Sequence, residues 1–153
     1  HVPMTLLPVS HRRQKQQADC LAACAAMVLD YLQIPINYDN LTRLLEVDAI
    51  GTPFRRLQNL QTLGLKIYIG EGDLPTLQTY LEVGLPTIVA VDTSQLPYWE
   101  ETADHAVVVV GLDEEQVYLN DPDTSNAHQS VPIPDFELAW LEKDYLFAVI
   151  ELV

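Results

Sequence analysis

The sequence predicts an α+β fold in which a helical lobe packs on an antiparallel β-sheet. In the first part of the chain, apolar residues recur at helical spacing, whereas the second part carries the β-branched runs typical of strands. Of the 153 residues, 48% are hydrophobic and 20% are charged, which is enough apolar material for the core of one domain. We expect residues 1–153 to form that domain, with a helical lobe at about 14–63 and a sheet lobe at about 65–153.

The longest predicted helix runs from about Cys20 to Leu32. Asp19 suits its N-cap, and Pro35 ends it because proline cannot continue a helix. Its apolar residues recur at helical spacing: Leu21, Cys24, Met27, Val28, Tyr31 and Leu32. Two more helices are expected, one at about 38–45 and one that starts after the Thr-Pro pair at 52–53 and stops at Gly64.

Strands and helices alternate after Gly64. In order, we expect a strand at 65–69, a helix from 73–75 to Gly84, a buried strand at 87–91, a strand at 105–112, a turn at 113–115, a strand at 116–120, a polar loop at 123–129, a helix at 135–141 and a strand at 145–152. The strand at 116–120 stops at Asp121-Pro122, since proline cannot donate to a sheet ladder.

The predicted hairpin at 105–120 has a consequence for two polar residues. His105 begins its first strand, and Asp121 follows its second strand. In an antiparallel hairpin with a short turn, the start of one strand lies beside the end of the next. We therefore expect the side chains of His105 and Asp121 to meet, although they are 16 positions apart in the sequence.

Cys20 is a candidate nucleophile. It lies in the first turn of the longest predicted helix, where unpaired backbone N–H groups and the helix dipole favour negative charge. A thiol reacts as its thiolate, so it needs such a site or a neighbouring imidazole. His105 would be the base, oriented by Asp121. Buried cysteines are more often core residues, which is our interpretation of Cys24, and the competing His128 lies in a polar loop.

The composition excludes several classes of function. With 22 acidic and 8 basic residues, the net charge of −14 repels phosphate backbones and anionic lipid surfaces, so we expect neither nucleic-acid binding nor membrane insertion. Metal-ligand spacing is absent from the sequence, so no zinc site is expected. Two cysteines four residues apart fit a reducing, cytoplasmic setting. The sequence begins with His1 rather than with Met. The residues before Met4 are therefore interpreted either as added residues or as the start of a processed or excised chain.

Two segments resemble the bacteriocin-processing, double-glycine leader peptidases, a papain-like family of cysteine peptidases. The segment 14–27 reads Gln-Lys-Gln-Gln-Ala-Asp-Cys-Leu-Ala-Ala-Cys-Ala-Ala-Met, which is similar to the family's N-terminal signature around its nucleophile. The segment 105–122 is similar to the second signature, a His followed by a β-branched run, an acidic turn, a short strand and Asp-Pro. The resemblance spans most of the chain in the family's order.

The resemblance implies a thiol protease with a cleft between a helical lobe and a sheet. In it, Cys20 attacks the scissile carbonyl, His105 exchanges the proton, Asp121 orients His105, and Gln14 completes the oxyanion hole. No cofactor is implied. The implied partners are a peptide or protein substrate and a peptide exporter, because family members are commonly domains of such exporters. A stand-alone protein and an excised domain both remain open.

Three residues bear on the substrate. The family usually has Gly directly after the nucleophile, whereas this chain has Leu21, which narrows the cleft. Tyr98 and Trp99, shortly before His105, are interpreted either as an apolar wall of the cleft or as residues that pack their loop onto the core.

Two alternative functions also remain open. One is a catalytically silent peptide-binding module of the same fold, and the other is an acyl transferase or amidase that uses Cys20, His105 and Asp121.

Overall fold

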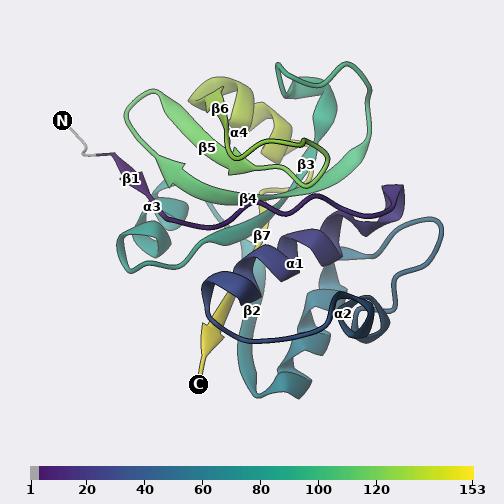
Figure 1. Cartoon of the computed structure of the whole chain (residues 1–153). Coiled ribbons are helices and arrows are strands. Elements are labelled where there is room, and N and C mark those ends of the chain that lie inside the picture. The colour runs from purple at the N-terminus through teal and green to yellow at the C-terminus, as the bar shows by residue number, and fades with distance from the viewer. Residues whose placement is uncertain (1–3) are drawn as a thin grey trace.

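The computed structural model describes residues 4–153, which form one antiparallel sheet with helices on both faces (Figure 1). The question about the residues before Met4 lies outside the described residues. The strands are β1 Thr5–Leu6, β2 Leu65–Glu71, β3 Thr87–Asp92, β4 Asp104–Leu112, β5 Gln116–Asn120, β6 Gln129–Pro132 and β7 Leu146–Leu152. The helices are α1 Cys20–Tyr31, α2 Tyr38–Leu44, α3 Leu74–Glu82 and α4 Ile133–Leu141, with 3-10 helices η1 Gln17–Asp19, η2 Phe54–Leu63 and η3 Thr93–Gln95.

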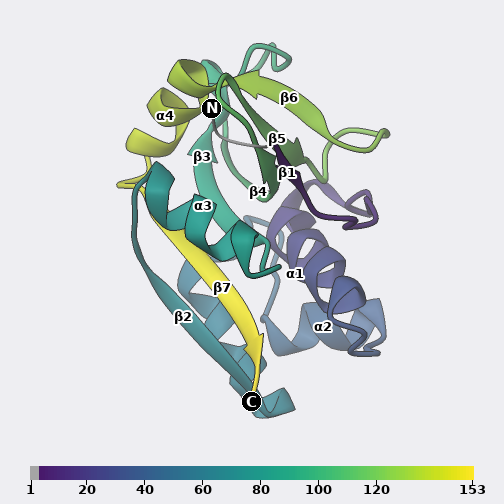
Figure 2. The ribbon, with the colours of Figure 1, turned by 90° about the vertical axis from the view of Figure 1, so that its left-hand side faces the viewer.

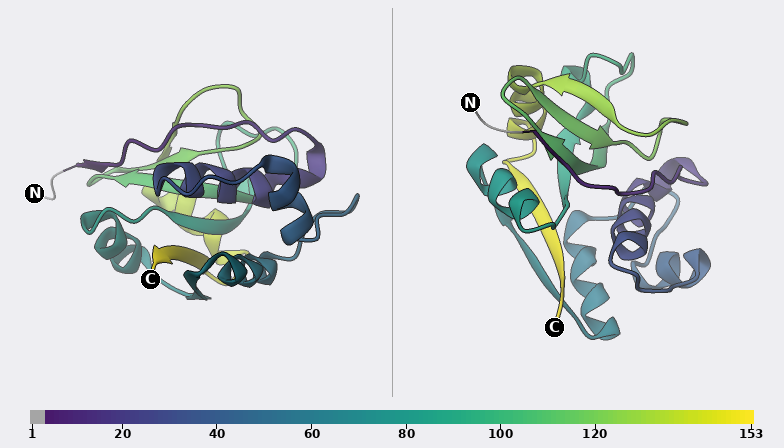
Figure 3. Two further views of the ribbon diagram at one scale, coloured as in Figure 1. Left: turned by 60° about the horizontal axis from the view of Figure 1, so that its bottom comes forward. Right: turned by 60° about the vertical axis from the view of Figure 1, so that its left-hand side comes forward.

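The strands do not lie in sequence order. Their order is β2-β7-β3-β4-β5-β6, with β1 added beside β4, and every pairing is antiparallel. The last strand, β7, therefore lies between β2 and β3, and Figure 3 shows it in yellow between these two teal strands. The α+β fold with an antiparallel sheet was predicted correctly, whereas this insertion was not anticipated.

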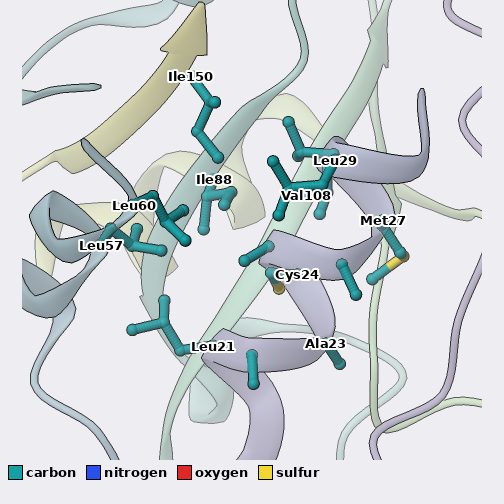
Figure 4. Close-up of a cluster of buried hydrophobic side chains, with 14 of the residues drawn as sticks. Leu21, Ala23, Cys24, Met27, Leu29, Leu57, Leu60, Ile88, Val108 and Ile150 are labelled. Atoms are coloured by element: carbon teal, nitrogen blue, oxygen red, sulfur yellow. The ribbon is translucent and has the colours of Figure 1, made fainter. Parts of the chain in front are cut away.

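Alternating residues of the strands face two separate cores. On β4, Val108 faces the helices α1 and α2 together with η2, whereas Val107 faces α3 and α4. Figure 2 shows α1 and α2 on one side of the strands, and Figure 4 shows Val108 and Ile88 beside residues of α1 and η2. The period of two along a strand explains why the sheet can be apolar on both faces.

The helix α1 is buried along most of its length. Every residue from Leu21 to Leu29 is at most 2% exposed, and four of these are alanines, which allow close approach to the sheet. Asp19 precedes the helix as predicted, but its side chain caps no backbone N–H. Instead its carboxylate is buried and accepts a hydrogen bond from the Tyr38 hydroxyl at 3.3 Å. The partner of the Asp19 carboxylate is thus the Tyr38 hydroxyl rather than a backbone N–H of α1.

Several boundaries differ from the sequence prediction. The segment 54–63 is a 3-10 helix, in which side chains three apart eclipse one another. β1 and β6 were not predicted, because they are two and four residues long and carry no alternation of their own. α4 begins at Ile133 rather than 135. The helix that ends before Gly64 and the α3 N-cap at Asp73, which accepts from the Thr76 N–H at 2.9 Å, are as expected.

A β-bulge sets the register that the site depends on. β4 and β5 pair as Leu112 with Val117 and Gly111 with Tyr118, and the register then shifts so that Val109 pairs with Leu119. Because side chains alternate along a strand, His105 shares a face with Val109, and Asp121 shares a face with Leu119. Without the bulge, Asp121 would lie opposite Val108 on the other face and Pro122 would take its place opposite Val107, so the extra residue in β4 puts the carboxylate on the face of the histidine.

Candidate active site

Asp121 lies at the end of β5 and is fully buried. Its carboxylate accepts four hydrogen bonds. The Oδ1 atom accepts from His105 Nε2 at 2.6 Å and from the Asp123 backbone N–H at 2.9 Å. The Oδ2 atom accepts from the Tyr98 hydroxyl at 2.6 Å and from Trp99 Nε1 at 2.9 Å. Burial raises the pKa of Asp121, but these donors together lower it below the usual value, so the group is held as a carboxylate.

His105 lies near the start of β4, is 8% exposed, and is fixed between two partners. Its Nε2 bonds Asp121, and its ring lies near the side chain of Cys20, with which it lines two grooves. Burial lowers the pKa of His105, but the interactions with Asp121 and Cys20 outweigh it and raise the pKa to about 9. Because Nε2 is occupied by Asp121, Nδ1 is the nitrogen that remains for the sulfur.

Cys20 is the first residue of α1 and is partly exposed. The helix enters the core directly after it, so the thiol is left at the helix N-terminus beside the ring of His105. Cys24, one turn later, has no exposed surface and belongs to the core, as its predicted place implied. Burial and the nearby Cys20 and Asp121 raise the pKa of Cys24 well above its usual value. The two cysteines therefore differ sharply in access to solvent.

Gln14 belongs to the segment that precedes α1. Its backbone N–H donates to the Pro122 carbonyl at 2.8 Å, which ties it to the turn after Asp121. Its side-chain amide donates to the carbonyls of Gln16 and Gln17, both at 3.1 Å, and its buried Oε1 has no partner within residues 4–153. The amide thus lies beside Cys20 but is turned toward its own loop.

Two contacts that sequence reasoning missed hold this N-terminal segment on the sheet. His11 Nε2 donates to the Asp121 backbone carbonyl at 2.8 Å, and Asn120 donates its amide to the Val9 carbonyl at 2.9 Å. Figure 1 shows the purple segment running across the sheet from β1 to the start of α1. Such contacts join residues about 110 positions apart, so no local sequence pattern predicts them.

The same segment contacts the helical side through Tyr38. The guanidinium of Arg12 lies 5.5 Å from the centre of the Tyr38 ring, and the ammonium of Lys15 lies 4.8 Å from it. Arg12 also pairs with Asp30 of α1 at 3.1 Å. Burial and the Asp19 carboxylate raise the pKa of Tyr38. Gln14, between the two cations, is therefore held from both lobes.

Two grooves meet at Cys20 and His105. The first, of about 780 Å³, runs between the N-terminal segment and the loop 98–104, and is lined by Gln14, Tyr98 and Trp99. The second, of about 570 Å³, is lined by Leu21, by the loop 50–54 and by residues of the sheet, with charged residues also in its lining: Asp48, Arg56, Asp104 and Lys143. Leu21 itself is 2% exposed, so its side chain forms the buried floor of the second groove rather than a projection into it.

The remaining candidates lie elsewhere. His128 is exposed in the loop before β6 and packs edge-on against Tyr118, with ring centres 5.5 Å apart, so it lines neither groove. Across the described residues 4–153, His, Cys, Asp and Glu side chains form no group of three that could hold a metal ion. In the same residues, no helix has both the length and the apolar character that crossing a membrane requires.

Solved structures define the class of fold. A C39-like peptidase from Bacillus anthracis matches with a TM-score of 0.79 and 18% identity, over 97% of each chain. The peptidase domain of ComA from Streptococcus, a bifunctional ABC transporter involved in quorum sensing, matches with a TM-score of 0.77 and 22% identity, over 95% of this chain and 99% of that one. A double-glycine motif protease from an AMS/PCAT transporter, solved with its leader peptide, gives 0.77 and 18%, over 97% and 94%. The fold is thus that of C39-type peptidase domains.

The sequence itself assigns the family. A family model described as the Peptidase C39 family matches residues 9–148, so the chain belongs to the C39 peptidases. This confirms the resemblance to double-glycine leader peptidases that was drawn from the segments 14–27 and 105–122. A search of curated proteins found no match.

Proposed function

We propose that this chain is an active cysteine endopeptidase that hydrolyses a peptide bond at a leader-peptide or similar small-residue site. One observation carries the proposal: His105 bonds the Asp121 carboxylate at 2.6 Å and lines the same two grooves as Cys20, which lies at the start of α1. A thiol, an imidazole and a carboxylate in this order can generate a thiolate nucleophile paired with an imidazolium. The proposed catalytic residues are therefore Cys20, His105 and Asp121.

The proton balance of the reaction follows from the raised pKa of His105. With a pKa of about 9, the His105 ring is protonated at neutral pH. The Cys20 sulfur attacks the scissile carbonyl, the C–N bond breaks, and His105 gives its proton to the leaving amine. The acyl group is then a thioester on Cys20. His105 takes a proton from water, the resulting hydroxide attacks the thioester, and the acid product leaves as the thiol is restored.

Gln14 is the proposed oxyanion donor, together with the Cys20 backbone N–H. The tetrahedral intermediate carries negative charge on oxygen, which preorganised N–H groups stabilise. In the free protein, the Gln14 amide donates to the carbonyls of Gln16 and Gln17. We infer that substrate binding exchanges one of these hydrogen bonds for the oxyanion, because the amide already lies in the groove beside Cys20.

The groove geometry bears on the substrate. Leu21 and the apolar residues around it give the second groove an apolar part beside Cys20, which suits small side chains next to the scissile bond. The relatives named above include a double-glycine motif protease bound to a leader peptide, which supports a peptide with small residues at the cut. A peptide exporter is the proposed partner, and the free thiols of Cys20 and Cys24 suit the reducing cytoplasm.

The first experiment is alkylation of the native protein with iodoacetamide between pH 4 and pH 9, with mass mapping of the modified residue. Cys20 should react well below pH 8 because His105 stabilises its thiolate, and the reaction of a His105→Ala variant should move to higher pH. Cys24 serves as an internal control, since its buried thiol should stay unmodified in the folded protein. A Cys20 that titrates near 8.5 in both proteins would overturn the catalytic assignment.

The second experiment tests hydrolysis directly. Synthetic peptides that join an amphipathic leader to a cargo through Gly-Gly, Gly-Ala or Leu-Leu are incubated with the protein, and the products are measured by mass spectrometry. We expect cleavage after the small pairs, none after Leu-Leu, and none by Cys20→Ala, whereas Cys24→Ala stays active. Binding without cleavage would favour the peptide-binding module. Transfer to an added amine in place of water would favour the acyl transferase.

A further inference from the structure

We infer that Tyr98 and Trp99 are positioning residues that hold the Asp121 carboxylate in the orientation His105 requires. The inference rests on the proposed function, in which Asp121 orients His105. It extends the three proposed catalytic residues by two aromatic side chains that the sequence interpretation placed only against substrate or core. Neither is proposed to touch the reacting atoms through its polar group.

The two oxygens of the Asp121 carboxylate have different hydrogen-bond partners. Oδ2 accepts from the Tyr98 hydroxyl at 2.6 Å and from Trp99 Nε1 at 2.9 Å, while Oδ1 accepts from His105 at 2.6 Å. A carboxylate can rotate about its bond to Cβ, which would exchange the two oxygens or tilt both away from the ring. Two donors on Oδ2 oppose that rotation, so Oδ1 stays directed at Nε2.

Trp99 contacts the histidine as well. Its ring packs against the His105 ring with centres 4.9 Å apart at an interplanar angle of 60°. One residue therefore restrains both members of the pair, the carboxylate through its N–H and the imidazole through its ring. This contact limits the tilt of the His105 ring.

The loop that carries Tyr98 and Trp99 is itself fixed at both ends. Thr93 is fully buried, and its hydroxyl donates to the Glu101 carbonyl at 2.7 Å and accepts from the Ala103 N–H at 2.8 Å. At the other end, the Trp99 N–H donates to the Leu96 carbonyl at 3.1 Å. The two aromatic donors are thus presented by a braced loop, as a positioning role demands.

The charged and titratable groups around Asp121 make these donors necessary. His105 of β4 faces it, Cys20 and Cys24 of α1 lie close by, and Asp123 follows it in the chain. Asp123 and the Cys20 thiolate are negative and would favour protonation of Asp121. Donation from Tyr98 and Trp99 to Oδ2 offsets this effect and keeps the carboxylate ionised.

The test is a titration of His105 that does not depend on peptidase activity. His105 carries labelled ring nitrogens, its NMR signal is assigned by its loss in His105→Asn, and its pKa is measured in the full chain. Tyr98→Phe keeps the ring and removes one of the two donors that fix Oδ2, so Oδ1 is held less firmly against Nε2. Because the hydrogen bond to Asp121 raises the pKa of His105, we expect that pKa to fall by about half a pH unit, with the same direction in Trp99→Phe.

The matched control is Tyr31→Phe, which also removes one tyrosine hydroxyl bonded to oxygen, in this case to the Gly84 carbonyl at 2.7 Å and far from Asp121. It should leave the titration of His105 unchanged. A His105 pKa that stays in place or rises in both Tyr98→Phe and Trp99→Phe would overturn the inference. Because the readout is a proton equilibrium, this result is separate from any failure to find a cleaved peptide.

A second arm applies where cleavage is detected. Both variants should lower kcat about tenfold and leave KM nearly unchanged, because phenylalanine keeps an aromatic lining in the groove and only the donor to Asp121 is lost. The alkaline limb of the rate profile should move to lower pH along with the titration. An increase in KM at constant kcat would instead assign Tyr98 and Trp99 to substrate binding, and would contradict the positioning role.

Discussion

The two sides of the site are held by different forces. On the sheet side, His105 and Asp121 are nearly or fully buried and fixed by hydrogen bonds from four separate positions. On the helical side, Cys20 and Gln14 are partly exposed, and the Gln14 amide bonds only its own loop. The proposed acid–base pair is thus built as a rigid polar network, whereas the nucleophile depends on the apolar burial of α1 behind it.

This difference indicates on which side of the site a substitution should reduce stability and on which side it should reduce the rate. A buried network of charge-assisted hydrogen bonds loses much when one member is removed, because each remaining polar group is left without water. A side chain at the rim of a groove can lose a contact and find water in its place. We therefore expect the sheet side to fail in stability and the helical side to fail in rate, and the following variants test this division.

The largest expected effect is that of Asp121→Ala. It leaves the donors of His105, Tyr98 and Trp99 without their buried acceptor, so the free energy of unfolding should fall by about 3–5 kcal/mol. Urea denaturation followed by tryptophan fluorescence measures it. The control is Asp113→Ala at the other end of the same hairpin, where the carboxylate has solvent access and a smaller loss is expected. Equal losses in both would contradict the division.

Gln14→Ala should show the opposite pattern. If its amide stabilises the oxyanion, kcat should fall by about 10²–10³. The stability should hardly change, because the side chain bonds only the carbonyls of Gln16 and Gln17. Steady-state kinetics and a urea titration on the same preparation separate the two effects. Gln16→Ala, two residues along the same segment, is the control that should keep full activity.

The pH profile gives a third, smaller effect. The pKa of His105 is raised from 6.5 to about 9, so its charged form persists through neutral pH and is lost as the pH rises through 9. The rate should therefore be flat from about pH 7 to 8 and fall about fivefold between pH 9 and pH 10. kcat/KM measured against pH checks this. A limb near 6.5 would show that the Asp121 and Cys20 contacts do not hold the proton.

The smallest effect is expected from Lys15→Ala. Its ammonium lies 4.8 Å from the Tyr38 ring, a contact worth about 0.5–1 kcal/mol at an exposed site. Thermal unfolding should show a decrease of that order, with a modest loss of kcat because Gln14 is held less firmly. Lys66→Ala on the exposed side of β2 removes the same charge without an aromatic partner. An equal loss of stability in Lys66→Ala would contradict the assignment of the Lys15→Ala effect to the contact with the Tyr38 ring.

The proposed site residues were predictable where local patterns place them. The β-branched run after His105 and the Asp-Pro stop at 121–122 predict a hairpin, and the hairpin brings the two side chains together at 2.6 Å. The helix start at Cys20 was equally clear, because apolar spacing defines a helix within a few turns. Those features depend on residues close in the sequence.

What could not be predicted depends on partners far along the chain. The bulge between Val109 and Gly111, the donors of Tyr98 and Trp99 to Asp121, and the tie of His11 to the Asp121 carbonyl all arise from three-dimensional register. The Asp19 cap failed for the same reason, since the Tyr38 hydroxyl from α2 competes for the carboxylate. Polar side chains have several acceptable partners, and only the packed fold selects among them.

The position of β7 between β2 and β3 has a consequence for synthesis. The ribosome makes residues 65–92 early, yet β2 pairs only with β7, which it makes more than fifty residues after β3. During translation the edges of β2 and β3 that pair with β7 therefore remain unpaired. A nascent chain in that state can pair through these edges with other chains. The hairpin with His105 and Asp121 can close earlier. The synthesis of β7, rather than any local step, should thus time the completion of the sheet, and a truncation before residue 146 should aggregate rather than fold.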